Sequence, residues 1–408
     1  MESRVCPHLL QAMVERTSYR TIALLACCQA LLLTNGAGLI AMTALIGYEL
    51  APQKSLATFG AATYVIGSAL ATMPASLWMA RVGRRRGFMT GAMINVAGCA
   101  LAIVALLAGS FVLFCLATGV VGVYNAIGLQ YRFAAAEVAT TADRPKAISL
   151  VLAGGIVGGF LGPASTVLAR DWIPAAPFAG SFLLLAAYAL VALAVQSRVH
   201  VPKPVIPHDS PSARPLAAIA RQPAFVVAVL AGALGYGLMN LLMVATPLAM
   251  SFCSHPYGQA ALVIQWHVVG MYAPGFVTGH LIARFGVLRV IVAGVLTVGG
   301  CVAVALAGNS VAHFLVALAL LGVGWNFMYT GATALLGESH GPHEKAKVQG
   351  ANDFAIFATM AISSLSSGAL VSAAGWERMN LGALPVLAVV LVAVAWLARA
   401  RRLRPQAA

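Results

Sequence analysis

The residues of this chain that could bind a ligand or form ion pairs fall into a pattern that occurs twice. Tyr124 and Asn125 are followed by an acid twelve residues after the asparagine, and then by a second acid and two bases. The same types return 201 positions later, since 326 minus 125 is 201. The first copy continues with Glu137, Asp143, Arg144 and Lys146, and the second consists of Trp325, Asn326, Glu338, Glu344, Lys345 and Lys347. In a chain with only 9% charged residues, this recurrence indicates that one half was duplicated.

Two ionisable residues inside apolar stretches are candidates for exchanging a proton. Asp353 and His267 both lie in segments that are otherwise apolar or amide-bearing. Ionisable groups are costly inside a membrane, so they are functional candidates there. Two alternatives stay open: Asp353 could pair with a lysine or arginine near the end of its helix, and His267 could be a hydrogen-bonded cavity residue without a role in proton coupling.

Composition defines the elements that must position these residues. The chain is 61% hydrophobic with a mean hydropathy of +0.89. Only 9% of its residues are charged, whereas roughly 25% are charged in ordinary globular domains. A helix needs about 20 apolar residues to cross a bilayer. Twelve such stretches are predicted, near 21–46, 53–79, 88–109, 111–136, 146–169, 176–197, 223–251, 258–283, 287–307, 310–336, 348–373 and 380–398. The runs are too continuous for the alternating pattern of a β-barrel, so we expect an all-α membrane protein.

The positive charges predict its orientation. When loops are assigned alternately to the two sides, one side receives only Lys54, Arg170 and Arg378 of the 25 lysines and arginines. The positive-inside rule then places both termini in the cytoplasm. The net charge of +14 therefore reflects topology and not nucleic-acid binding, which would need a basic face on a soluble module.

A proline-rich segment divides the chain into two halves of six helices. Residues 199–222 and the adjoining Pro223 contain six prolines with scattered charge, so we expect neither a regular helix nor a packed core there. The predicted organisation is an N-terminal bundle over 1–198, a cytoplasmic linker over 199–222, and a C-terminal bundle over 223–408.

Two loops resemble the signature loop of the major facilitator superfamily, Gly-x-Leu-x-Asp-Arg-x-Gly-Arg-Arg. Residues 76–85 read SLWMARVGRR and residues 279–286 read GHLIARFG, in the expected place of each half. Alanine stands at both aspartate positions, at Ala80 and Ala283, so the usual charge relay of this loop is in doubt. The resemblance implies that the loop gates neighbouring helices, through Arg81, Gly83, Arg84, Arg85, Arg284 and Gly286. The alternative is that the arginines are only a topology signal.

If the chain follows this family, the resemblance implies a central cavity lined by the first, fourth, seventh and tenth helices, which opens to each side in turn. The polar and aromatic residues at middle depth of these helices are then the candidate substrate contacts. They are Asn35, Tyr124, Asn125, Gln130, Tyr236, Asn240, Trp325, Asn326 and Tyr329. Amides and aromatic faces suit a flat, largely neutral solute, although the amides could instead join helices. Arg132 is the one cation nearby, and we expect it to pair with Glu137 or another neighbour.

A glycine series in the fifth helix bears on the direction of transport. Gly154, Gly155, Gly158, Gly159 and Gly162, followed by Pro163, are similar to a family motif associated with antiporters, but its last two glycines are missing. Small residues at this spacing also let helices approach closely, and we favour that interpretation.

These features favour a secondary transporter, and no motif for ATP hydrolysis, metal binding or nucleophilic catalysis occurs. We therefore expect no enzyme activity, cofactor or metal. We expect a monomer in a bacterial inner membrane that carries a small-molecule substrate, either alone or together with a coupling proton. Residues 322–338 and 348–353 resemble bacterial permeases of the riboflavin-transporter type, which implies uptake of a heteroaromatic vitamin. The alternatives are proton-coupled export of drugs or hydrophobic metabolites, and a non-transporting receptor or scaffold with this fold.

Overall fold

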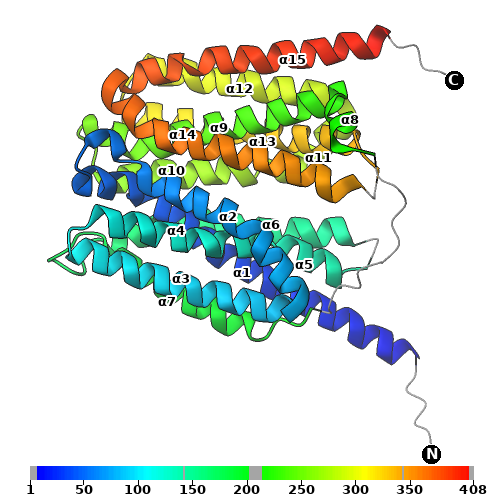
Figure 1. The fold of residues 1–408 in the computed structure, drawn as a ribbon, viewed down its shortest axis with the longest axis horizontal. Helices are drawn as coiled ribbons and strands as arrows, with labels where there is room; N and C mark the ends of the chain where they lie inside the picture. Colours follow the sequence, from blue (N-terminus) through cyan, green and yellow to red (C-terminus); the bar gives the residue numbers. More distant parts are fainter. Residues whose placement is uncertain (1–6, 141–142, 202–213, 342–343, 404–408) are drawn as a thin grey trace, which may run out of the picture.

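The computed structural model describes residues 7–140, 143–201, 214–341 and 344–403, and these form long helices joined by short loops (Figure 1). The helices of the first half are α1 (Pro7–Leu50), η1 (Lys54–Leu56), α2 (Phe59–Val82), α3 (Arg84–Leu107), α4 (Phe111–Gly128), α5 (Tyr131–Val138), α6 (Arg144–Ala169) and α7 (Ala179–Gln196). Those that follow are α8 (Leu216–Ala220), α9 (Pro223–Phe252), α10 (Tyr257–Tyr272), α11 (Gly275–Phe285), α12 (Val287–Ala307), α13 (Val311–Gly337), α14 (Lys345–Leu381) and α15 (Ala383–Leu403).

The expected twelve membrane-crossing helices are present in the described residues. Ten stretches of helix are long and apolar enough to cross a bilayer, and α10 with α11 form an eleventh that is bent by 41°. One of the ten, Lys347–Arg402, contains both α14 and α15, which run in opposite directions (Figure 1), so it supplies two crossings. The all-α membrane fold is therefore confirmed.

The two halves repeat the same arrangement of helices. In the first half α1 packs on α6 and α2 packs on α4, and in the second half α9 packs on α14 and α10 packs on α13. The signature loops have matching geometry, because Gly83 and Gly286 both have positive φ, of 93° and 88°. Only glycine adopts this conformation readily, so each loop can turn directly from one helix into the next.

Two of the predicted helices are interrupted, and a third break lies just beyond the predicted end of the eleventh. The fourth breaks after Gly128 and resumes as α5, and the eighth bends where Pro274 removes a backbone donor between α10 and α11. The third break is at Gly375 of α14, beyond the predicted bounds 348–373, where the φ of 80° is not helical. These breaks fall at glycine or proline. Proline has no backbone N–H to donate and glycine tolerates non-helical φ values, so a helix bends most readily at these residues.

Part of the linker is ordered against the C-terminal half. The expectation that it forms no helix or packed contact is wrong for Leu216–Ala220, which form the five-residue helix α8 with Ile219 fully buried. The start of the linker is also fixed, since Val199 is buried in the core of the N-terminal half. Much of the segment between these anchors, 202–213, lies outside the described residues.

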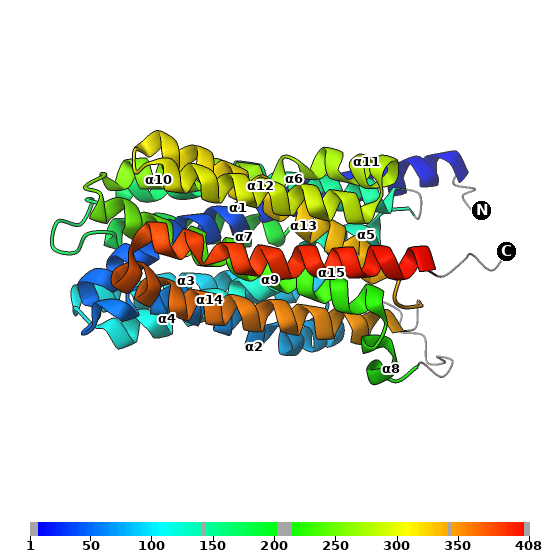
Figure 2. The same cartoon turned by 90° about the horizontal axis from the view of Figure 1, so that it is seen from above.

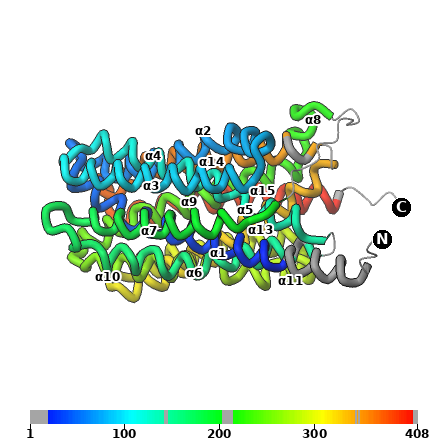
Figure 3. Tube along the Cα trace, turned by 90° about the horizontal axis from the view of Figure 1, so that it is seen from below, coloured from blue at the N-terminus to red at the C-terminus, as the bar shows by residue number. Residues whose placement is uncertain are grey.

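The halves meet along α2 with α14 and along α6 with α10. Figures 2 and 3 show these long helices lying along one axis, with α5, α8 and α11 toward one end of the molecule. Hydrogen bonds between the halves gather toward the other end. Thr58 donates to the Ser364 carbonyl at 2.7 Å and accepts from the Gly368 amide at 2.9 Å, and the Thr166 and Tyr257 hydroxyls lie 2.5 Å apart. We call these contacts the seam.

Candidate substrate-binding site

Four aromatic side chains of the C-terminal half form a cluster beside the interface between the halves. Trp325 and Tyr329 are one helical turn apart on α13, and their rings stack with centroids 5.0 Å apart and planes 8° apart. Tyr236 of α9 presents its edge to both, at 5.1 and 5.4 Å, and Tyr272 of α10 approaches Trp325 at 6.5 Å. We call these four residues the aromatic cluster. Three of them, Tyr236, Trp325 and Tyr329, are candidates from the sequence, which missed Tyr272.

Trp325 has an unused hydrogen-bond donor in this cluster. The residue is only 5% exposed, and its indole Nε1 has no hydrogen-bond partner among the described residues. A buried donor without a partner is costly, so such a group is informative about function. The cluster can therefore offer a solute both aromatic faces and a hydrogen bond.

Charged groups and one further tyrosine lie near the cluster. Asp353 of α14 is partly buried and accepts a long hydrogen bond, 3.4 Å, from its neighbour Asn352. The charge of Arg132 of α5 acts on Asp353, and Arg132 makes a polar contact with Tyr329. Tyr64 of α2 lies near Tyr236 and Tyr272. Of the partners expected for Arg132, Glu137 is bound by Arg84 instead, so the expectation of Glu137 or another neighbour is wrong for Glu137.

The predicted amides are engaged in holding helices together. Asn35 accepts from Asn95 at 2.8 Å and joins α1 to α3. Asn240 joins α9 to α14 by donating to the Ser363 and Ser364 hydroxyls. Asn326 donates to the Met271 carbonyl at 2.7 Å and accepts from Thr278 at 2.7 Å, which ties α13 to α10 and α11. Asn125 donates to Ser68 at 3.1 Å and is the least buried of the four.

The two remaining predicted contacts lie away from the aromatic cluster. Tyr124 is 1% exposed within the core of the N-terminal half, where its hydroxyl lies next to that of Tyr131. Gln130 is 8% exposed and accepts from Arg84 at 3.2 Å, so it faces the signature loop. Both side chains have the contacts described here within the N-terminal half, and their binding roles stay predictions.

His267 joins two helices of the C-terminal half. It is fully buried on α10, and its Nδ1 lies 2.7 Å from the Leu318 carbonyl of α13, so this nitrogen carries the proton. Its Nε2 has no partner among the described residues. The imidazole is thus held in one tautomer with a free acceptor, and its part in proton coupling stays a prediction.

The signature loop of the first half is attached to the end of the fourth crossing. Arg84 donates to Glu137 from Nε at 3.2 Å and from Nη2 at 2.6 Å, a two-pronged ion pair. Arg81 and Arg85 are exposed, as is Arg284 in the second half, where the guanidinium lies 5.3 Å from the Phe285 ring centre. The gating roles of these arginines stay predictions, and Arg84 is the one with a fixed partner.

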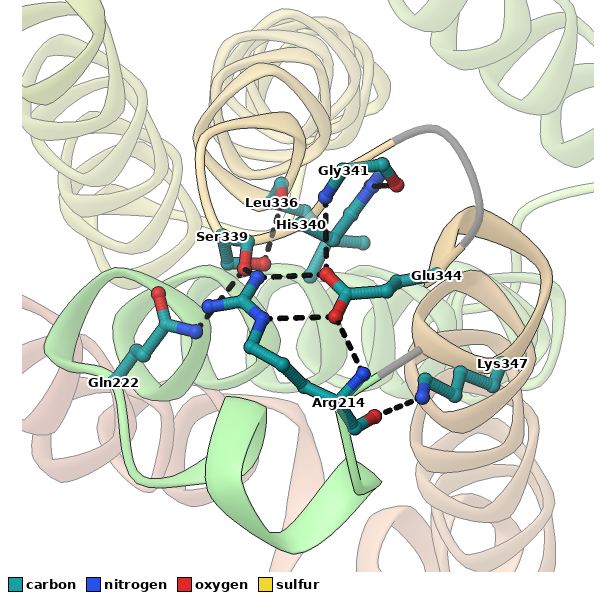
Figure 4. A network of polar contacts seen from close by, with 8 residues as sticks. All are labelled: Arg214, Gln222, Leu336, Ser339, His340, Gly341, Glu344 and Lys347. Atoms are coloured by element: carbon teal, nitrogen blue, oxygen red, sulfur yellow. Dashed lines mark hydrogen bonds and ion pairs between the residues drawn. The ribbon is translucent and has the colours of Figure 1, made fainter. Parts of the chain in front are cut away.

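The linker is attached to the second half by a network around Glu344 (Figure 4). Arg214 donates to this carboxylate from Nε at 2.8 Å and from Nη2 at 2.6 Å, and Gly341 donates its amide at 3.0 Å. Gln222 binds the Ser339 carbonyl at 3.1 Å beside them. The Arg214 hydrogen bonds and then the Gly341 amide favour the charged carboxylate, so they lower the pKa of Glu344 to about 2.

The glycines of α6 have two packing partners. A methyl group added at Gly154, Gly158 or Gly162 would overlap the backbone of α1, with approaches of 2.3 to 2.5 Å. A methyl group at Gly159 would meet Val268 of α10, across the interface between the halves. The series therefore packs α6 closely against two neighbours, which accounts for its spacing without reference to direction of transport.

The described residues contain no group of three or more histidine, cysteine, aspartate or glutamate side chains that could hold a metal ion. The arrangement instead offers aromatic faces, a free donor and opposite charges at an interface between two similar halves.

Comparison with known proteins identifies the family. A model of the Major Facilitator Superfamily matches residues 25–265 and again residues 235–408. Riboflavin transporter RfnT of Brucella anthropi is 41% identical over 377 residues, which cover 91% of this chain and 94% of that protein. Two Bacillus subtilis proteins, the uncharacterized MFS-type transporters YdeG and YddS, are 29% and 27% identical and match 88% and 89% of this chain, in each case over 88% of the relative. The chain therefore belongs to the major facilitator superfamily and is a multi-pass membrane transporter.

Proposed function

We propose that this protein carries riboflavin, or a vitamin with a similar fused heteroaromatic ring, into the cell. The observation that carries the proposal is the stacked pair Trp325 and Tyr329 with Tyr236 against both rings. The 41% identity to a riboflavin transporter over nearly the whole chain supports the same substrate class.

The aromatic cluster suits a flat ring system for a physical reason. Stacking of a nucleic-acid base on an aromatic side chain contributes about 1–3 kcal/mol, and it needs only a π-face. Trp325 adds a free indole N–H, which a ring carbonyl could accept from. A lipophilic cation or an aliphatic drug would use the aromatic faces but would leave this donor unpaired.

Transport proceeds by alternating access in this proposal. The loops that carry most of the positive charge lie on the cytoplasmic side, with both termini, and the seam then faces outward. Hydrogen bonds at Thr58 and Tyr257 close the outer side in this conformation. Asp353 lies about two turns from the start of α14 and its charge acts on Tyr329, and in this proposal it exchanges the coupling proton.

Uptake of radiolabelled riboflavin tests the proposal, in bacteria that lack their own flavin transporter. The informative variant is Trp325→Ala, and its matched control is Trp396→Ala, because Trp396 is 48% exposed on α15. We expect saturable uptake in the wild type and in Trp396→Ala, and a loss of about 5- to 100-fold in apparent affinity in Trp325→Ala.

The opposite results are equally clear. If verified membrane expression gives no riboflavin uptake, flavin import is wrong, and efflux of hydrophobic compounds from the same cells becomes the next measurement. If uptake occurs but both tryptophan variants behave alike, the aromatic cluster is not the binding site.

A further inference from the structure

Arg132 does not pair with Glu137, one of the partners that its position in the sequence suggests. It lies on α5, five residues before Glu137, but Glu137 is occupied by both prongs of Arg84. The Arg132 guanidinium packs 4.8 Å from the Phe133 ring centre, and its Nε is buried without a hydrogen-bond partner among the described residues. The Nε–H of this partly buried guanidinium is therefore available to an acceptor that is not part of the protein.

The charge of Arg132 acts on several groups of the other half of the molecule. Arg132 makes a polar contact with Tyr329, and its charge acts on Asp353, Tyr236 and Tyr272 without a close ion pair to Asp353 among the described residues. These residues come from α13, α14, α9 and α10, whereas α5 belongs to the N-terminal half. Arg132 therefore reaches across the interface toward the aromatic cluster.

This asymmetry matters for coupling binding to movement. The whole aromatic cluster is supplied by the C-terminal half, so a solute stacked there would touch mainly one moving body. A ligand shifts a conformational equilibrium only if it interacts differently with the two states. Movement of the halves changes the distance between the aromatic cluster and a group on the N-terminal half, and Arg132 is such a group, already beside it.

We propose that Arg132 is a substrate contact of the N-terminal half and a residue through which binding draws the two halves together. This inference rests on the proposed function and narrows its substrate class. The guanidinium donates to carbonyl oxygens at the edge of the stacked ring, and Asp353 on the opposite half accepts from a ring N–H. The site thus takes a planar heterocycle whose edge alternates carbonyl acceptors with an N–H donor.

The chemistry of the two side chains accounts for this selection. Arginine presents N–H groups in a rigid planar fork and has no acceptor, whereas an ionised carboxylate only accepts. Together they are electrically neutral, so a neutral ring with both kinds of edge group satisfies them and a simple anion or cation does not. Loss of a hydrogen bond to a charged group corresponds to roughly 10- to 100-fold in affinity.

The test compares binding with turnover in the same proteoliposomes. Riboflavin binding is followed by quenching of flavin fluorescence, and uptake is measured at saturating riboflavin. The variants are Arg132→Gln and Arg132→Lys, and the control is Arg399→Gln, an exposed arginine at the end of α15. A second ligand, riboflavin methylated at the ring N–H, reports on Asp353.

We expect Arg132→Gln to weaken binding roughly 10- to 100-fold and to lower the maximal uptake rate even when the site is saturated. Arg132→Lys should recover part of the affinity, because it keeps the charge and loses the fork. The methylated ligand should bind the wild type at least 10-fold more weakly than riboflavin, and Asp353→Asn should reduce this discrimination.

Two results would overturn the inference in different ways. If the wild type binds riboflavin and Arg132→Gln changes neither affinity nor maximal rate more than Arg399→Gln does, the inference is wrong and the proposed function stands. If the correctly folded wild type binds no riboflavin, the proposed function is wrong and this narrower substrate class falls with it. Elution as a single peak in size-exclusion chromatography verifies the fold of each variant.

Discussion

The packing of α6 against α1 allows one substitution to be predicted in detail. A methyl group at Gly158 would lie 2.5 Å from the Ala30 carbonyl oxygen and 2.7 Å from the Thr34 amide nitrogen. Both are backbone atoms, so no side-chain rotation can relieve the overlap. Ordinary contacts begin near 3.4 Å, so α6 must move away from α1 by about 0.9 Å, the difference between 3.4 and 2.5.

The energetic cost follows from this displacement. Overpacking of a close-packed interior typically costs about 1–3 kcal/mol, and alanine recovers about 0.5–1 kcal/mol because it favours the helix over glycine. We therefore expect Gly158→Ala to lower the free energy of unfolding by about 1–2 kcal/mol. Gly299→Ala is the matched control, since Gly299 lies in the middle of α12 and its added methyl would meet no atom within 4 Å.

Thermal unfolding of the purified variants in one detergent provides the assay, followed by intrinsic fluorescence and by recovery of the monodisperse peak. Gly158→Ala should melt several degrees below the wild type, and Gly299→Ala at or above it. Equal melting temperatures for the two variants would show that the close approach of α6 to α1 does not limit stability. The explanation of the glycine series by packing would then be refuted.

Two further predictions concern polar contacts. Glu344→Gln should lower the melting temperature more than Glu338→Gln, because Glu344 holds the linker through Arg214 whereas Glu338 forms an exposed ion pair at the surface. Since the pKa of Glu344 is lowered to about 2, its contribution should be complete above the ordinary glutamate pKa of about 4.3 and disappear as pH falls through about 2, which melting curves of both proteins across pH would reveal. Asn240→Ala should reduce stability by about 1–2 kcal/mol in a detergent unfolding titration, because it removes hydrogen bonds between α9 and α14; an unchanged midpoint would contradict the role of this amide in joining helices.

The helical scaffold was predictable because membrane solvation acts on long stretches of sequence. A run of about 20 apolar residues is sufficient evidence for a crossing, so all twelve helices were anticipated, and Val287–Ala307 has the predicted bounds. The positions at which helices break were harder to predict from the sequence. Gly128 and Pro274 permit a bend, but whether a helix bends there depends on neighbours that the local sequence does not specify.

The site was only partly predictable for a related reason. Tyr236, Trp325 and Tyr329 stand out as large aromatic residues at middle depth, and the structure brings them together. Burial depth alone cannot distinguish a ligand contact from a helix contact, and so Asn240 and its fellow amides were indistinguishable from the cluster residues. The partner of Arg132 could not be predicted from the sequence, because the partner depends on which side chains lie close together in the fold. There Glu137 is paired with Arg84.

The 201-residue repeat indicates two copies of one unit, and these copies now contribute different residues to the site. The scaffold has kept its order and pairing of helices, down to the matching glycine turns at 83 and 286. The side chains that these helices carry differ between the halves: the aromatic cluster lies in the C-terminal half and Arg132 in the N-terminal half. A homodimer of single units would have to carry both sets of residues on the same six helices. Fusion removed that constraint, so a substrate without two-fold symmetry could acquire an equally unsymmetric site.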